Sequence, residues 1–405
     1  MHASPVVPVL GRWLRRACPA IHAVRATAVI AVVEALVLGA KLALTPLGRN
    51  LRSAAFAKHS IKRVDRLLGN RHLRRERSLI YGAVARWLLA ATPRPVLLID
   101  WADCGPGDAR HRWLLLRAAV PLGGRALPIY EEVHPLGRYN SPRTHRRFLA
   151  HLRAVLPETC APILITDAGF RGPWFREVER YGWDWVGRVR NQVKYRLAHA
   201  EDEAWAYTTA LYPAATPAPR HVGRVLLSHR QSYGCHLYVV RQYRRGRGRP
   251  RQAHGQGATA RRCRKLHKDP WLLATSLPHT SGAARRVVEL YALRMKIEEG
   301  IRDTKDARWG FALRYARSRR VERMEVLLLL AALGTLAAWL CGLAAEAHEW
   351  ARHFQVNTLR TRSVLSTVFV GRQVLASQRL RLRCGELQRQ LAHLPALVAN
   401  DASAA

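Results

Sequence analysis

Two short apolar segments of this 405-residue chain each run directly into an aspartate. Residues 96–99 precede Asp100, and residues 162–166 precede Asp167. Such segments predict strands that are buried on both faces of a sheet, as in α/β folds. A carboxylate at the end of a buried strand is costly unless hydrogen bonds or a cation compensate its charge. The two aspartates therefore predict either ordinary turn or helix-cap positions or, if they lie together, a shared divalent cation.

The segments around the aspartates fit a layered α/β fold. Strand-like residues 113–120 and 126–130 flank a Leu-Gly-Gly-Arg turn sequence and predict a hairpin. Helix-like residues 143–156 and 174–181 lie on either side of the second aspartate strand, and strand-like residues 185–189 follow. The pattern becomes short strands and loops after about residue 195, and helical from residue 283 nearly to the end.

The predicted helix over residues 285–306 carries a polar stripe. Its members, at steps of three, four and seven residues, are Tyr291, Arg294, Glu298 and Lys305. At about 100° per residue they lie within roughly 60° of one another, whereas Glu299 points about 100° away from Glu298. A solvated face with an Arg294–Glu298 pair worth roughly 0.3 kcal/mol explains this stripe. A catalytic face with one carboxylate and two cations explains it as well, and the spacing alone does not separate the two.

Three motifs resemble the DDE triad and the Y-R-E-K signature of the insertion-sequence-four family of bacterial cut-and-paste, hairpin-forming transposases. The motifs are LLIDWAD around Asp100, LITDAGFRGPW around Asp167, and YALRMKIEEGIRDTK around Glu298. The similarity extends to residues 58–73, 269–278 and 353–367, and so covers most of the chain.

The resemblance implies an α/β fold, in which a ribonuclease-H-like catalytic core contains a mainly β insertion and is flanked by N-terminal and C-terminal helical regions. The implied domains are an end-binding helical domain (1–94), the first part of the core (95–195), the insertion with a basic loop (196–284), the core helix with the third carboxylate (285–320) and a helical dimerisation region (321–405).

The resemblance also implies the chemistry. Asp100, Asp167 and Glu298 are the expected catalytic and metal-binding residues, holding two Mg²⁺ ions for which Mn²⁺ is expected to substitute. Two such ions stabilise the attacking and leaving oxygens of an in-line displacement at phosphorus. Nicking, hairpin formation, hairpin opening and strand transfer would follow in that order, without a small-molecule cofactor. Tyr291, Arg294 and Lys305 are expected to hold phosphates.

A DNA hairpin is tight, so a base near its fold must leave the stack, and an aromatic side chain offsets the lost stacking by about 1–3 kcal/mol. Trp271 occupies the position where the family places such a tryptophan, and Met295 is suited to wedge into the space that the base vacates. From the residues alone, each is also consistent with core packing.

The charge of the chain indicates its partners. There are 67 Lys and Arg against 28 Asp and Glu, a net charge of +39, which predicts a polyanion such as nucleic acid or an anionic membrane. At 49% hydrophobic residues, the chain is excluded from the class of disordered basic tails.

Two segments concentrate this charge. Residues 49–77 contain ten basic residues and two acids, with apolar residues at helical spacing, and so predict a basic helix pair that is either a charged surface or a DNA-binding domain. The expected DNA contacts there are Lys58, Lys62, Arg63, Arg66 and Arg71. The Gly-rich residues 244–268 predict a mobile basic loop, in which residues 247–250 have the form of a minor-groove arm or a nonspecific phosphate contact.

Seven scattered cysteines without a C-x-x-C pair predict a reducing compartment, here the bacterial cytoplasm and its nucleoid. Residues 326–345 carry no charge over 20 positions and meet the length criterion for a membrane span. Their Ala and Gly content favours a central helix of a soluble domain, so no membrane partner is expected.

The sequence therefore predicts a metal-dependent DNA transposase that binds the inverted repeats at the ends of its own element, acts as a homodimer and joins those ends to target duplex DNA. A related nuclease that cuts without joining, and a catalytically silent DNA-binding derivative, are the alternatives.

Overall fold

The computed structural model describes residues 4–105, 112–190, 192–200, 204–241, 269–361, 363–377 and 380–404. The chain forms two compact units. Unit 1 comprises Met1–Pro162 and Met295–Ala404, and unit 2 comprises Ile163–Arg294. The predicted basic loop at residues 244–268, including residues 247–250, lies outside the described residues.

Unit 1 begins with helices, of which α4 buries one face. In α4 the buried residues include Ser60, Val64 and Leu67, at steps of four and three residues. The Asn70 side chain caps the next helix by accepting two backbone N–H groups, which separates α5 from α4. The predicted basic helix pair is thus confirmed. The N-terminal helices are α1 (Val6–Ala17), α2 (Ala23–Val37), α3 (Leu44–Arg49), α4 (Ala57–Leu68) and α5 (Arg71–Leu88).

Three antiparallel strands form the sheet of unit 1. They are β1 (Val96–Asp103), β2 (Trp113–Leu122) and β3 (Arg125–Pro135), in the order β3-β2-β1. The predicted hairpin is confirmed, and Gly123 takes the positive φ of 49° that its turn requires. Asp100 lies inside β1 rather than at its end, because β1 continues to pair with β2 as far as Asp103. The short helix η1 (Leu136–Arg138) and then α6 (Pro142–Val155) follow β3.

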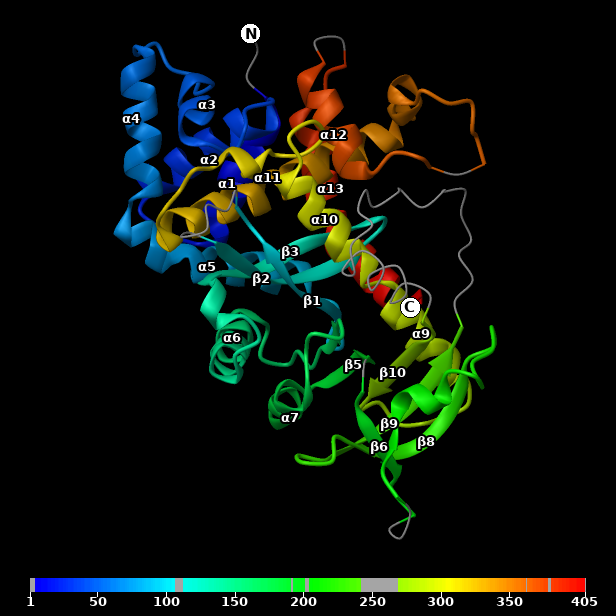
Figure 1. The fold of residues 1–405 in the computed structure, drawn as a ribbon. Coiled ribbons are helices and arrows are strands. Elements are labelled where there is room, and N and C mark those ends of the chain that lie inside the picture. The colour runs from blue at the N-terminus through cyan, green and yellow to red at the C-terminus, as the bar shows by residue number, and fades with distance from the viewer. Residues whose placement is uncertain are drawn as a thin grey trace, which may run out of the picture. The chain divides into compact units, whose positions relative to one another are not determined.

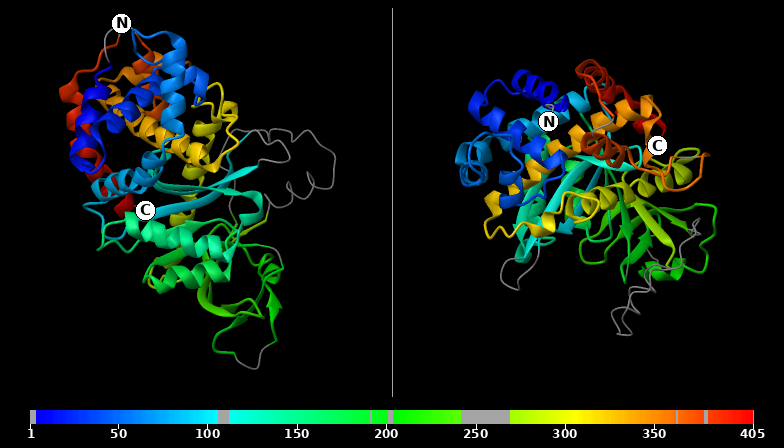
Figure 2. Two further views of the ribbon diagram at one scale, coloured as in Figure 1. Left: turned by 90° about the vertical axis from the view of Figure 1, so that its left-hand side faces the viewer. Right: turned by 90° about the horizontal axis from the view of Figure 1, so that it is seen from above.

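Helices dominate the second part of unit 1. They are α10 (Met295–Lys305), η3 (Leu313–Tyr315), α11 (Val321–Ala347), η4 (Trp350–Phe354), α12 (Thr367–Ala376) and α13 (Cys384–Ala404). By length and composition α11 is the one helix of the described residues that matches a membrane span, and 89% of its most apolar window is buried inside the protein. Figure 2 shows this helix, in orange, between the blue N-terminal and red C-terminal helices, all of unit 1. The predicted central helix is confirmed.

Unit 2 is mainly β (Figure 1). Its strands are β4 (Ile163–Thr166), β5 (Asp184–Val189), β6 (Lys194–Leu197), β7 (Ala206–Tyr207), β8 (Arg220–Leu227), β9 (Tyr233–Val240) and β10 (Trp271–Thr275). They follow the order β4-β5-β10-β9-β8-β6-β7, in which only the β4–β5 pair is parallel. The helices are α7 (Gly172–Arg180), η2 (Thr208–Leu211) and α9 (Ala283–Ala292). The mixed α/β fold and the β-rich segment between the second and third carboxylates are confirmed.

The single helix predicted over residues 285–306 is wrong. The backbone forms two helices, α9 and α10, with Leu293 and Arg294 between them. At this point the N–H groups of both residues donate three residues back, to Leu290 and Tyr291, rather than four. Because such a turn is tighter than the α-helix, a spacing of 100° per residue does not carry across it.

Helices α11 and α12 cross so closely that only glycine fits at the contact. A Cβ atom on Gly371 would lie 1.8 Å from the carbonyl oxygen of Ala338, and one on Gly342 would lie 2.0 Å from that of Thr367. Both clashes are with backbone, which has no rotamer by which to move away.

We predict that Gly371→Ala destabilises the protein by about 1–3 kcal/mol or more, because the two helices must separate to admit the methyl group. Thermal unfolding measures the effect, and Gly385→Ala is the matched control, since nothing lies within 4 Å of a Cβ at that helical position. An unchanged midpoint for Gly371→Ala would contradict the packing described here.

Candidate active site

Asp100 and Glu298 line one cavity of unit 1, with a volume of about 370 Å³. Asp100 is 9% exposed on β1, and Glu298 lies in the first turn of α10. Glu299, the next residue, instead pairs with Arg125 and Arg302. The cavity thus brings together the first and third of the carboxylates that the sequence singles out.

Lys305 lines the same cavity and lies on α10 about two helical turns after Glu298. Its Nζ donates to the backbone oxygen of Asp103 at 2.9 Å. Burial lowers the pKa of Lys305, and the neighbouring Asp103 carboxylate opposes that shift. Arg302, Arg314 and a third carboxylate, Asp306, also line the cavity, so it holds three cations and three carboxylates.

A buried ion pair lies beside Asp100. In the register of the sheet Asp100 is opposite Arg117, and Arg117 is opposite Glu131, so the three side chains leave the same face. Arg117 Nε donates to Glu131 Oε1 at 2.7 Å, and the two residues are 1% and 0% exposed. Tyr81 Oη of α5 donates to the other carboxylate oxygen at 2.9 Å. Burial, and then the charge of Glu131, raises the pKa of Tyr81 well above its ordinary value, so the phenol remains a donor.

Three consecutive residues fasten α10 to the three strands of unit 1. Asp303 accepts from Arg125 Nε of β3 at 2.6 Å. Thr304 Oγ1 accepts from Arg117 Nη2 of β2 at 3.2 Å, and Lys305 donates to β1. Contacts to all three strands fix both the rotation and the axial position of the helix, and therefore where Glu298 stands relative to Asp100.

Asp167 belongs to unit 2, directly after β4, as predicted. It is half-buried, and its Oδ1 accepts the backbone N–H of Gly169 at 2.8 Å. This bond leaves the other carboxylate oxygen unused by the turn. The Asp167 charge also raises the pKa of Tyr291, although burial is the larger cause.

Tyr291 is the centre of a second cluster in unit 2. It is 4% exposed and meets the Trp271 ring edge-on at 4.9 Å. The Arg294 guanidinium lies 6.0 Å from the Tyr291 ring, and that of Arg188 lies 5.9 Å from the Trp271 ring. Two cations and two aromatic rings thus gather here, with Trp271 half-exposed. Met295 begins α10 in unit 1 and is 49% exposed.

The basic residues predicted to contact DNA are all exposed. Lys58, Lys62, Arg63 and Arg66 lie on α4 opposite its buried residues, and Arg71 begins α5. This placement is what a helix needs to offer cations to a polyanion while its apolar side packs on the protein.

The donor chemistry of the carboxylate cavity fits a hard divalent cation, since carboxylate oxygens are the ligands that Mg²⁺ prefers. Asp100 and Glu298 are the residues that would hold it in unit 1. Within the described ranges, no three His, Cys, Asp or Glu side chains gather as one metal-binding group.

Comparison with known proteins assigns the family. Residues 92–334, more than half of the chain, match the model of the transposase DDE domain. The chain belongs to this family. It is thus a DDE transposase, an enzyme of a class that acts on DNA and typically uses divalent metal ions.

One similar solved structure is a piggyBac transposase synaptic complex with hairpin DNA, studied by cryo-electron microscopy. The similarity covers 100% of this chain and 80% of that one, at 10% identity and a TM-score of 0.43. No curated protein matches the DDE transposase described here.

Three residues at these sites are not predicted from the sequence. Arg117 interrupts the apolar run WLLLRAAV, and a lone charge in a buried strand signals a buried partner. Its partner is Glu131, in the run PIYEEV of the next strand. Arg188 carries a similar signal in WVGRV, but only the fold shows that it lies beside Trp271.

We predict that Arg117→Met destabilises the transposase by about 3–5 kcal/mol, because it leaves the Glu131 carboxylate buried without its cation. Thermal unfolding measures this loss, and a double variant that adds Glu131→Met should recover most of it. The matched control is Arg112→Gln, whose pair with Asp103 is exposed and worth less than about 1 kcal/mol. Equal stability of Arg117→Met and the wild type would show that the pair does not hold the sheet.

Proposed function

We propose that this DDE transposase binds the terminal inverted repeats of its own element and moves that element by cut-and-paste transposition, as a member of the insertion-sequence-four family. The observation that carries the proposal is the cavity shared by Asp100 and Glu298, with Lys305 on its wall. Two carboxylates for a divalent cation and a cation for a phosphate are what a phosphoryl-transfer site requires.

Asp167 acts with Asp100 and Glu298 in this proposal, on the strength of the motif that surrounds it in the sequence. The expected cofactor is Mg²⁺, two ions per site, with Mn²⁺ as a substitute. Bound there, the ions supply a nucleophile at neutral pH and neutralise charge at the phosphorus.

The cationic side chains hold the DNA strand while it reacts. Lys305 is fastened by its bond to β1, so its ammonium is held at one place on the cavity wall. Arg294 is held over the Tyr291 ring in unit 2. Each is suited to a phosphate on one side of the scissile bond, because a pre-positioned cation loses little freedom when the phosphate binds.

Hairpin formation at the cut ends is the next part of the proposal. Trp271 is half-exposed and braced edge-on by Tyr291, so the ring is held without being covered. Such a ring supports a flipped base by stacking. Met295, also exposed, is proposed as the side chain that enters the vacated space.

The remaining parts of the proposal concern assembly. The basic face of α4 and the start of α5 would contact the transposon ends, and residues 247–250 would add a minor-groove or phosphate contact. The helical residues 321–405 would provide contacts between two copies on DNA. The enzyme would act on target duplex DNA in the bacterial cytoplasm, at the nucleoid.

We predict that Asp100→Asn, Asp167→Asn and Glu298→Gln each lower the rate of end cleavage by about 10²- to 10³-fold or more, because each removes a ligand that stabilises charge in the transition state. A gel assay with labelled terminal-repeat DNA and Mg²⁺ measures cleavage. Glu299→Gln is the matched control, since Glu299 lies next to Glu298 outside the cavity, and it should cleave at nearly the wild-type rate.

Binding to the same DNA should be retained by all four variants, which separates a lost reaction from a lost fold. Cleavage by Asp167→Asn or Glu298→Gln at the wild-type rate would contradict the catalytic role proposed for these carboxylates. Strand transfer from precut ends then separates a transposase of this type from a nuclease that does not join.

A further inference from the structure

A second pocket of unit 1 is lined by six arginines and has a volume of about 800 Å³. Residues of α5, β3, η1, α6 and the start of α11 line it. It shares no lining residue with the carboxylate cavity. We call it the arginine groove, and its arginines are Arg74, Arg77, Arg86, Arg138, Arg143 and Arg147.

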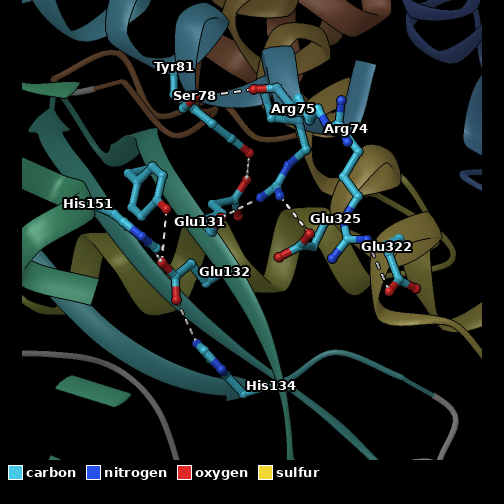
Figure 3. A network of polar contacts seen from close by, with 12 residues as sticks. Arg74, Arg75, Ser78, Tyr81, Glu131, Glu132, His134, His151, Glu322 and Glu325 are labelled. Carbon is cyan, nitrogen blue, oxygen red and sulfur yellow. Dashed lines mark hydrogen bonds and ion pairs between the residues drawn. The ribbon is translucent and has the colours of Figure 1, made fainter. Parts of the chain in front are cut away.

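The carboxylates of the groove already have partners (Figure 3). Glu325 pairs with Arg77 at 2.6 Å, and Glu322 pairs with Arg74 at 3.3 Å. These two arginines are therefore balanced by glutamates from α11. Their positive charge is largely neutralised, so they attract an anionic ligand only weakly.

Glu132 of β3 also has partners within the protein. His151 Nδ1 lies 2.7 Å from one carboxylate oxygen and His134 Nε2 lies 2.9 Å from the other, while Tyr130 Oη donates at 2.8 Å. Burial alone would raise the pKa of Glu132, but these contacts outweigh it and lower the pKa to about 2. The carboxylate is thus ionised, buried and turned toward the histidines that Figure 3 shows on either side of it.

Four arginines of the groove have no such balance. Arg86, Arg138, Arg143 and Arg147 are exposed, and none makes an ion pair or side-chain hydrogen bond with any residue in the part of the chain that the structure describes. They come from α5, η1 and α6, three of the elements that line the groove. A hollow lined by unneutralised guanidinium groups is complementary to a polyanion.

The spacing along α6 matches a nucleic-acid backbone. Arg143, Arg147 and His151 follow at intervals of four residues and lie on one face of the helix. Eight residues of α-helix rise about 12 Å. Phosphates on one strand of duplex DNA are spaced at about 3.4 Å along the axis, so this face is as long as a run of three to four phosphates.

We propose that the arginine groove binds the sugar-phosphate backbone of duplex DNA without reading its sequence. The proposal rests on the proposed function, in that it gives a DNA transposase a grip on DNA that does not carry its terminal repeats. Guanidinium groups form paired hydrogen bonds with phosphate oxygens. The contact uses residues distinct from the basic face of α4.

The test compares two triple variants of the full-length protein. Arg138→Gln/Arg143→Gln/Arg147→Gln removes three charges from the groove, and Arg12→Gln/Arg15→Gln/Arg16→Gln removes three from the exposed face of α1. Fluorescence anisotropy measures binding to a random-sequence duplex of about 30 base pairs, over a series of salt concentrations. The groove variant should bind at least about tenfold more weakly, and its plot of log K against log salt should flatten by about two to three units, while the α1 variant stays near wild type.

Equal losses in the two triple variants, or no loss in the groove variant, would overturn the groove as a site. Thermal unfolding of both variants excludes a folding defect, and the single variant Arg147→Gln, expected to lower the salt slope by about one, provides a second measurement. These outcomes do not depend on end cleavage. If the wild type binds the random duplex through the groove but never cleaves terminal repeats, the proposed function fails and the groove stands.

Discussion

Two opposite charges, Arg117 and Glu131, lie side by side in unit 1 with almost no surface exposed to water. A buried charge is tolerated only beside its partner, so β2 and β3 are held in the register that pairs them. A slip of one residue between the two strands would turn one of these side chains to the opposite face of the sheet, away from its partner. Asp100 is opposite Arg117 in the sheet, and Thr304 of α10 accepts a hydrogen bond from Arg117. The Arg117–Glu131 pair therefore positions both the strand that carries Asp100 and the helix that carries Glu298.

The exposed basic faces of the protein are separate from the carboxylate cavity. Excess arginine and lysine lies on exposed faces, such as that of α4 and the walls of the arginine groove, where a polyanion can displace water and counterions. The net charge of +39 thus includes exposed basic faces that are separate from the small cavity in which carboxylates and cations occur together.

The sequence predicts the buried strands and the hairpin because their signals are local, whereas Asp100, Glu298 and Lys305 are expected together only through the family resemblance of their motifs. Asp100, Glu298 and Lys305 stand in dense motifs, and the hairpin is marked by its glycines. The break between α9 and α10 is not visible in the sequence, because Leu293 and Arg294 are ordinary helix residues and the change to a tighter turn is made by the backbone. The arginine groove is equally hidden, since Arg86 and Arg143 lie on different helices and become neighbours of one pocket only through β3. The strands β6 and β7 are not predicted because they are only four and two residues long, too short for a pattern to be recognised.

The central claim is that Asp100, Asp167 and Glu298 hold the same metal ions. Replacing Mg²⁺ with Fe²⁺ in the full-length protein on terminal-repeat DNA, and adding ascorbate and peroxide, generates hydroxyl radicals at the metal that cut the nearby backbone. Mass spectrometry of the fragments then locates the metal. We expect cuts close to residues 100, 167 and 298, all suppressed together by excess Mg²⁺. Cuts near residues 100 and 298 with none near 167 would contradict the account.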